Sequence, residues 1–274
     1  LDARALRLAD APARCAALPQ RVPAGLAIDS AHYVADGLAY AVHPVSRRLV
    51  GEPLPGHCVV RGRLEPTPAA PGARFEMRLP ASWNGRLLQQ GTHDPDRPMS
   101  EAFGRNTGAL GLEDSGLARG FAVLSGDVGL RRPHPTAAPT AGEEGADRAW
   151  VQLATAAKAL AAAHYGRPPD RSYFVGCGEG GREGVAFAER WPWTFDGIVA
   201  VAPTLRAADA ARAAAWTVRQ FEAVAPREGG QPVLARAFGA EQLFAVAGAV
   251  LAQCDGLDGA VDGFVMDPAR CQVD

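Results

Sequence analysis

The sequence predicts an α/β fold, in which a parallel β-sheet is covered by helices. A β-prone run over residues 172–176 leads through a cluster of glycines into a helix-compatible segment over 182–190. A second β-prone run, 195–203, follows this segment, and an alanine-rich amphipathic segment, 146–165, precedes the first run. Alternation of strand, helix and strand is typical of parallel sheets with helices on their faces. A chain of 274 residues is also long enough to bury a substantial core.

Strand patterns also occur earlier in the chain. Residues 58–64 and 74–79 alternate or nearly alternate apolar and polar side chains on either side of a proline-rich turn, which indicates a β-hairpin-like pair. Residues 86–90 predict another strand, and the short apolar run 120–127 is typical of a buried strand. These segments would extend the sheet on the N-terminal side of the glycine cluster.

We expect three parts along the chain. Residues 1–56 mix short apolar runs with turn residues and predict an N-terminal arm, whereas residues 57–206 hold the sheet-forming core. Residues 207–274 begin with two predicted helices, 207–225 and 232–253, and end in an acidic loop.

Composition limits the classes of partner and compartment. The net charge of −2 gives no sign of a nucleic-acid or anionic-membrane partner. No run approaches the roughly 18 apolar residues that a membrane-spanning helix needs. An odd number of cysteines in a secreted protein leaves one thiol free or bonded outside the chain, whereas five reduced thiols would fit a cytosolic protein. The five are Cys15, Cys58, Cys177, Cys254 and Cys271.

The glycine cluster at residues 176–181, GCGEGG, has the architecture of a nucleophile elbow. Such an elbow reads G-x-S-x-G, because the strained turn brings neighbouring backbones too close for a Cβ on either side of the nucleophile. Here the central residue is Gly178, so no hydroxyl is present. The adjacent Cys177 is a poor substitute, because it points elsewhere and no base is identifiable to form its thiolate.

Residues 172–184, together with 195–200 and the Ala-Pro pair at 202–203, resemble the tannase and feruloyl esterase family of α/β-hydrolases. Members of that family carry G-C-S-x-G-G-R at the elbow. The resemblance implies an incomplete α/β-hydrolase fold that ends at the start of the lid region. It also implies hydrolysis of a small aromatic-acid ester by a serine mechanism, in a secreted or periplasmic protein whose signal peptide has been removed.

The resemblance further assigns backbone donors to an oxyanion hole. One would be the N–H of Glu179, directly after the nucleophile position, and the other would lie near Gly91 or Thr92 in the loop after strand 86–90. His93 and Asp94 in the same loop fit a polar turn better than a catalytic or metal site.

The acidic loop, residues 254–264, carries three aspartates separated by glycines. Ca²⁺ takes six to eight oxygen ligands, and carboxylates and backbone carbonyls can supply them, whereas a solvated Asp-Gly turn is the alternative. The resemblance implies a structural calcium site. Its ligands would be the side chains of Asp255, Asp258 and Asp262 and the carbonyls of Ala260 and Phe264.

The resemblance also implies how the cysteines pair. The spacings of Cys15 with Cys58 and of Cys254 with Cys271 are similar to family disulfides, the second of which encloses the calcium loop. Cys177 would then bond a partner outside the chain, either a missing C-terminal half or a second chain.

A catalytic base is not identifiable. In α/β-hydrolases the acid and the histidine follow the nucleophile in the chain, and no histidine follows Gly178 here. His134 lies in a loop rich in proline, threonine and alanine, where a solvated role is expected. We therefore expect the N-terminal half of a larger fold, impaired or inactive by itself, since no acyl-enzyme forms without a hydroxyl.

Two other functions remain open from the residues. Residues 176–181 formally fit the dinucleotide fingerprint G-x-G-x-x-G, although Asp196 stands at the start of its strand and not at the end, where a ribose-binding acid belongs. The chain could also be a non-catalytic, hydrolase-like binding protein or an inactivated fragment. The sequence does not separate galloyl, feruloyl and terephthaloyl esters.

Overall fold

The computed structural model describes residues 6–8, 10–42, 49–67, 70, 72–92, 101–105, 115–128 and 142–272. The chain divides into two compact units, Leu1–Leu205 and Arg206–Asp274. The main sheet lies in the first unit, and the acidic loop lies in the second.

The main sheet has seven strands among the described residues, in the order β11-β10-β8-β9-β6-β5-β2. The pairs β11·β10, β10·β8 and β8·β9 are parallel, whereas the pairs β9·β6, β6·β5 and β5·β2 are antiparallel. The strands are β2 (Leu26–Val34), β5 (His57–Leu64), β6 (Ala73–Pro80), β8 (Arg86–Gln90), β9 (Ala122–Gly126), β10 (Arg171–Cys177) and β11 (Gly197–Val201).

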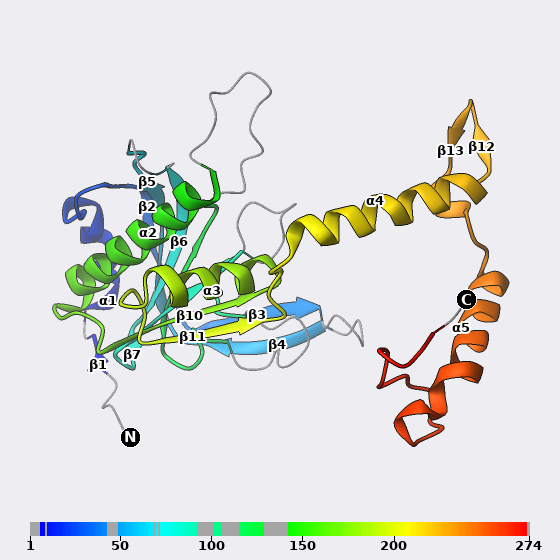
Figure 1. The fold of residues 1–274 in the computed structure, drawn as a ribbon. Coiled ribbons are helices and arrows are strands. Elements are labelled where there is room, and N and C mark those ends of the chain that lie inside the picture. The colour runs from blue at the N-terminus through cyan, green and yellow to red at the C-terminus, as the bar shows by residue number, and fades with distance from the viewer. Residues whose placement is uncertain are drawn as a thin grey trace. The chain divides into compact units, whose positions relative to one another are not determined.

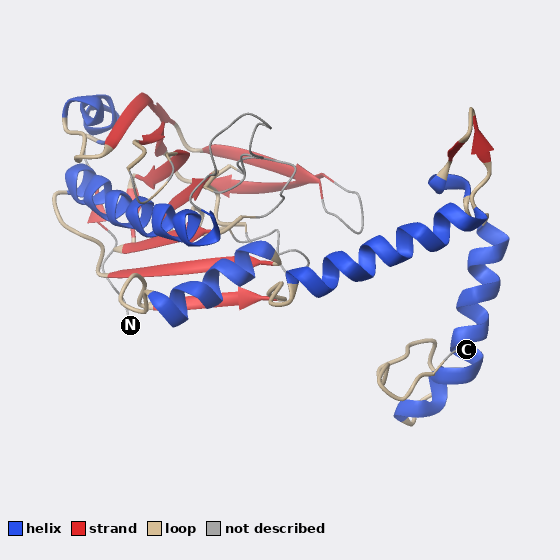
Figure 2. Cartoon of the chain, turned by 45° about the horizontal axis from the view of Figure 1, so that its top comes forward, coloured by secondary structure: helices blue, strands red, loops and turns tan. Residues whose placement is uncertain are grey.

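Helices α2 (Gly142–Tyr165) and α3 (Glu179–Arg190) cover one face of this sheet (Figures 1 and 2). Side chains alternate between the two faces of a strand, so each face has its own apolar cluster. The larger cluster lies under the helices and includes Trp150 and Phe174. The smaller one includes Leu88 and so lies on the opposite face. The parallel half of the sheet is therefore held by helix packing next to the elbow.

Shorter elements complete the first unit. They are β1 (Leu6–Arg7) paired with β7 (Ser82–Trp83), α1 (Ala11–Ala17), η1 (Leu18–Gln20), and the antiparallel pair β3 (Gly37–Val42) and β4 (Leu49–Leu54). Residues 1–56, expected as an N-terminal arm held by a disulfide, also contribute β2 to the main sheet, where it pairs with β5. Sequence patterns did not reveal this, because β2 has no clean alternation of buried and exposed side chains.

The second unit contains α4 (Ala207–Val224), β12 (Arg227–Glu228), β13 (Gln231–Pro232), η2 (Leu234–Arg236), α5 (Ala240–Cys254) and η3 (Asp255–Asp258). The predicted helix over 232–253 was wrong at its start. Pro232 belongs to β13, and α5 begins only after Gly239, whose N–H donates to the side chain of Gln242 at 2.7 Å. No helix of the described residues has the length and apolar character needed to cross a membrane.

The disulfide of Cys15 with Cys58 is confirmed and joins α1 to β5. Its two residues are 43 positions apart, so replacing both with serine is expected to lower the free energy of unfolding by about 4 kcal/mol, through the added entropy of the open chain. Urea unfolding followed by tryptophan fluorescence measures this loss. The same change at Cys254 and Cys271, 17 positions apart, is expected to cost about 3 kcal/mol in the second unit. A loss below about 1 kcal/mol for the first pair would contradict the chain-entropy account.

Candidate active site

The elbow places Gly178 between β10 and α3 in a strained backbone conformation. Its φ is 60° and its ψ is −111°, a region that side-chain-bearing residues rarely adopt. The N–H of Gly178 donates to the carbonyl of Val201 at 3.0 Å, and its own carbonyl accepts the N–H groups of Arg182 and Thr204. These bonds to α3 and to the end of β11 hold the turn in place.

The flanking glycines are required by close backbone packing, whereas the central one is not. A Cβ at Gly176 would lie 2.2 Å from the carbonyl oxygen of Gly180, and a Cβ at Gly180 would lie 2.7 Å from that of Thr92. At Gly181 the carbonyl oxygen of Val201 would be only 2.6 Å away. Among the described residues, no atom lies within 4 Å of a Cβ built at Gly178. Position 178 therefore has the backbone of a nucleophile position and open space for a side chain.

The predicted oxyanion donors differ in availability. The N–H of Gly91 donates to Val175 at 2.9 Å, and the N–H of Thr92 donates to Glu183 at 3.0 Å, so both already have acceptors. The N–H of Glu179 has no acceptor among the described residues. It stands at the start of α3, where the helix dipole favours negative charge. In this arrangement Glu179 alone of the three offers an available donor beside Gly178, and its oxyanion role stays a prediction.

Sequence reasoning missed Glu183, which is 3% exposed on α3. Its carboxylate accepts the N–H and the hydroxyl of Thr92, at 3.0 and 2.7 Å, and the indole N–H of Trp150 at 3.0 Å. Burial raises the pKa of Glu183 to about 7, although the three donors oppose this rise. The sequence signal that could have pointed to Glu183 was its spacing from Glu179, because residues four positions apart lie on the same side of a helix.

The described residues leave Cys177 without a disulfide, and its side chain is half-buried. Its bond to a partner outside the chain therefore stays a prediction. His93, Asp94 and His134 lie outside the described residues.

The acidic loop uses its carboxylates as acceptors for its own backbone. Asp255, which is buried, accepts the N–H groups of Asp262 and Gly263. Asp258 accepts those of Ala260 and Met266, and these donors lower the pKa of Asp258. The N–H of Phe264 donates to Asp262 at 3.1 Å.

The disulfide of Cys254 with Cys271 closes this loop, as expected. The donor chemistry of carboxylates and carbonyls suits Ca²⁺. Among the described residues, however, no three His, Cys, Asp or Glu side chains are grouped so that they could hold a metal ion. The calcium ligands therefore stay a prediction.

Comparison with known proteins decides the family. The family model described as "Tannase and feruloyl esterase" matches residues 58–274. The chain belongs to the tannase and feruloyl esterase family. It is 35% identical over 236 residues to a mono(2-hydroxyethyl) terephthalate hydrolase of Piscinibacter sakaiensis, covering 80% of this chain and 39% of that protein. It is 31% identical over 201 residues to a probable feruloyl esterase B-2 of Aspergillus flavus, covering 72% of this chain and 35% of the relative.

Solved structures show the same fold. Feruloyl esterase B from Aspergillus oryzae matches with a TM-score of 0.68 and 23% identity, over 96% of this chain and 50% of that one. A tannin acyl hydrolase from Aspergillus niger matches with a TM-score of 0.55 and 19% identity, over 94% of this chain and 47% of that one. The fold is thus that of the α/β-hydrolase esterases. The chain spans about two fifths of the length of the curated relatives named above.

Membership of the tannase and feruloyl esterase family explains the dinucleotide-like glycine pattern. Glycines at 176, 180 and 181 are used for contacts within the elbow. Asp196, the acidic residue considered for a ribose, accepts the N–H and hydroxyl of Ser172 at 2.8 and 3.1 Å. Ser172 lies near the start of β10, at the opposite end of the strand from the elbow. The geometry therefore favours an esterase-type elbow over a nucleotide site.

Alanine substitutions test this distinction between glycines. Gly178→Ala is expected to lower the free energy of unfolding by about 1–3 kcal/mol, because a Cβ meets no atom but the positive φ is strained. Gly176→Ala is expected to cost more than about 3 kcal/mol, because its Cβ would overlap backbone that side-chain rotation cannot move. Urea unfolding of both variants measures the difference. Equal losses would contradict the elbow geometry.

Proposed function

We propose that the protein is a carboxylic-ester hydrolase of the family's serine type, with residue 178 as the nucleophile position and an ester of an aromatic acid as its ligand. The observation that carries this is the open space at Gly178, beside the available N–H of Glu179. An acyl group at that point would have its carbonyl oxygen next to a helix N-terminus, which stabilises a developing negative charge. Two relatives are named for their action on terephthalate and feruloyl esters, which supports aromatic-acid esters as the class.

The present chain is proposed to bind such esters without turning them over. A glycine offers no oxygen to attack the ester carbonyl, so no acyl-enzyme forms at residue 178. Backbone donors and ligand contacts persist when the nucleophile is lost, and they support binding. A non-catalytic binding protein is the second candidate, and the same glycine favours it.

Methyl ferulate tests both candidates. We expect it to shift the amide NMR resonances of Gly178 and Glu179, with no release of ferulate above the uncatalysed rate. Methyl 3-cyclohexylpropanoate, which keeps the six-membered ring and the three-carbon acyl chain but is not aromatic, is the control and is expected to bind at least about tenfold more weakly. Absence of any shift at the elbow would overturn the ester site. Enzymatic release of ferulate would show that a different nucleophile acts.

We also propose that the acidic loop binds Ca²⁺ in a structural role, through the side chains of Asp255, Asp258 and Asp262 and the carbonyls of Ala260 and Phe264. The support is the number of oxygen donors within ten residues and the disulfide that closes the loop. Binding would exchange backbone N–H partners of the carboxylates for the cation. The two disulfides also favour an oxidising compartment, and we propose a secreted or periplasmic location.

Calorimetric titration with CaCl₂ checks the metal proposal, with MgCl₂ as the control cation. Calcium at 100 times its dissociation constant is expected to stabilise the second unit by about 2.7 kcal/mol, since the unfolded loop does not bind it. Asp258→Asn is expected to weaken binding at least about tenfold, because it removes a charged ligand. Asp267→Asn, outside the proposed ligand set, is expected to leave binding unchanged. No heat at millimolar calcium with the disulfide intact would refute the site.

A further inference from the structure

Thr92 connects the loop after β8 to the elbow helix through all of its polar groups. Its N–H and its hydroxyl donate to Glu183, and its carbonyl accepts the N–H of Gly180 at 3.2 Å. Gly180 also packs directly on Thr92, since a Cβ built at Gly180 would lie 2.7 Å from the carbonyl oxygen of Thr92. The position of Thr92 relative to Gly178 is therefore set by α3.

We propose that Glu183 is a positioning residue, whose carboxylate acts through Thr92 to hold Gly91 and Thr92, the first two residues after β8, against the elbow. The inference rests on the proposed ester site, because the placement of these residues matters to a ligand bound beside Gly178. Glu183 is 3% exposed and would act on such a ligand only through Thr92.

The geometry suits a carboxyl group and does not accept its amide. One oxygen of Glu183 accepts the Thr92 N–H, and the other accepts both the Thr92 hydroxyl and the Trp150 indole N–H. A glutamine in either orientation would direct its NH₂ group at one of two fixed N–H donors. A buried donor without an acceptor costs free energy, so glutamine would release either Thr92 or Trp150.

Three elements surround Glu183, and they differ in charge toward it. The loop after β8 and α2 contribute the neutral donors of Thr92 and Trp150, whereas Glu179 on α3 raises the pKa by its charge. Asp147 on α2 lies in ion pairs with Arg182 and Arg190, at 3.8 and 3.4 Å.

The pKa of Glu183 is raised from 4.5 to about 7, so the folded protein takes up a proton that the unfolded chain has lost. The stability from this proton is complete below pH 4.5 and disappears as the pH rises through about 7. The ionised carboxylate is the form that accepts all three donors at full strength, so raising the pH would tighten the contact with Thr92.

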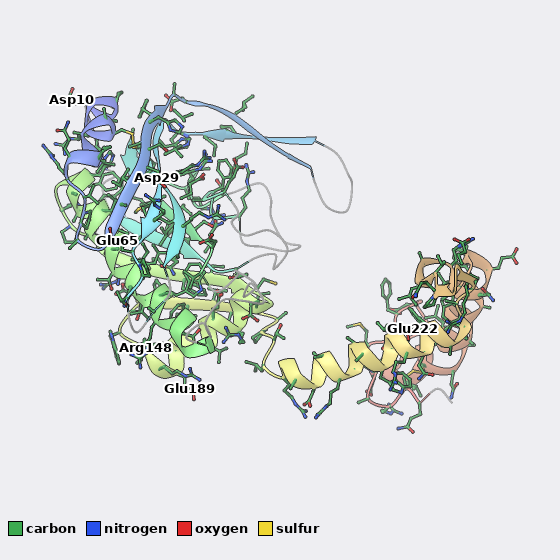
Figure 3. All side chains as sticks on the ribbon, turned by 90° about the horizontal axis from the view of Figure 1, so that it is seen from above. Asp10, Asp29, Glu65, Arg148, Glu189 and Glu222 are labelled. Carbon is green, nitrogen blue, oxygen red and sulfur yellow. A yellow bond between two sulfur atoms is a disulfide. The ribbon has the colours of Figure 1, made fainter. Side chains whose placement is uncertain are left out.

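NMR of the whole chain between pH 5.5 and 8.5 tests the proposal without using ester hydrolysis or binding. The Thr92 amide and the Trp150 indole resonances are expected to titrate together with a midpoint near 7, the pKa of Glu183. Glu183→Gln is expected to abolish this titration and to speed hydrogen exchange of the Thr92 amide at least about tenfold, because its acceptor is lost. Glu189→Gln is the matched control, because Glu189 lies on the same helix and points into solvent (Figure 3).

Unchanged hydrogen exchange of the backbone amides of Val60 and Met77, which lie in the core, would show that Glu183→Gln stays folded. If that variant does not fold, Thr92→Val serves in its place, because it removes only the hydroxyl. In Thr92→Val the titration of the Trp150 indole resonance is expected to persist, while hydrogen exchange of the amide at residue 92 becomes faster. Persistence of the common titration in Glu183→Gln, or unaltered Thr92 exchange in a folded Glu183→Gln or in Thr92→Val, would overturn the proposal. Failure of the ester site would leave these results unaffected, so the two failures are distinguishable.

Discussion

Close backbone contact at the elbow is the constraint on which the rest of the first unit depends. Helix α3 begins immediately after β10, and its first turn lies against the ends of β8 and β11 because Gly180 and Gly181 have no Cβ. Side chains at these positions would push the helix away from the sheet. The turn at Gly178, the placement of Thr92 and the packing of α3 over Phe174 all follow from this approach.

Buried carboxylates also accept backbone N–H groups along the connection from β8 to β9. Each of three accepts a backbone N–H from that connection: Glu183 from Thr92, Glu76 from Ala102 and Glu52 from Ser115. Glu76 and Glu52 are also paired with arginines, at 2.8 and 2.7 Å, whereas the donors to Glu183 among the described residues are all neutral. Arg78 lowers the pKa of Glu76 against the opposing effect of burial, whereas burial raises the pKa of Glu183 to about 7.

At Gly178 the backbone has the conformation of an esterase elbow, but the residue has no side chain. The backbone keeps a conformation that costs strain for any other residue, and the surrounding space would admit a side chain. Such geometry is maintained by the neighbouring residues, because Val201, Thr204 and Arg182 hold the turn through its backbone groups. The conformation of the turn is therefore set by backbone contacts and does not depend on a side chain at position 178.

Local sequence determined the elements around the elbow and the identity of its essential glycines. The strands predicted over 86–90 and 172–176, and the helix predicted over 182–190, correspond to β8, β10 and most of α3. They were predictable because periodicity and glycine clusters act over a few residues. Tertiary structure alone decided that β2 joins the main sheet and that the N–H of Thr92 is occupied. It also decided that Glu183 is buried. Thr92 and Glu183 are 91 positions apart, and only the packing of α3 on the sheet brings their polar groups within hydrogen-bond distance.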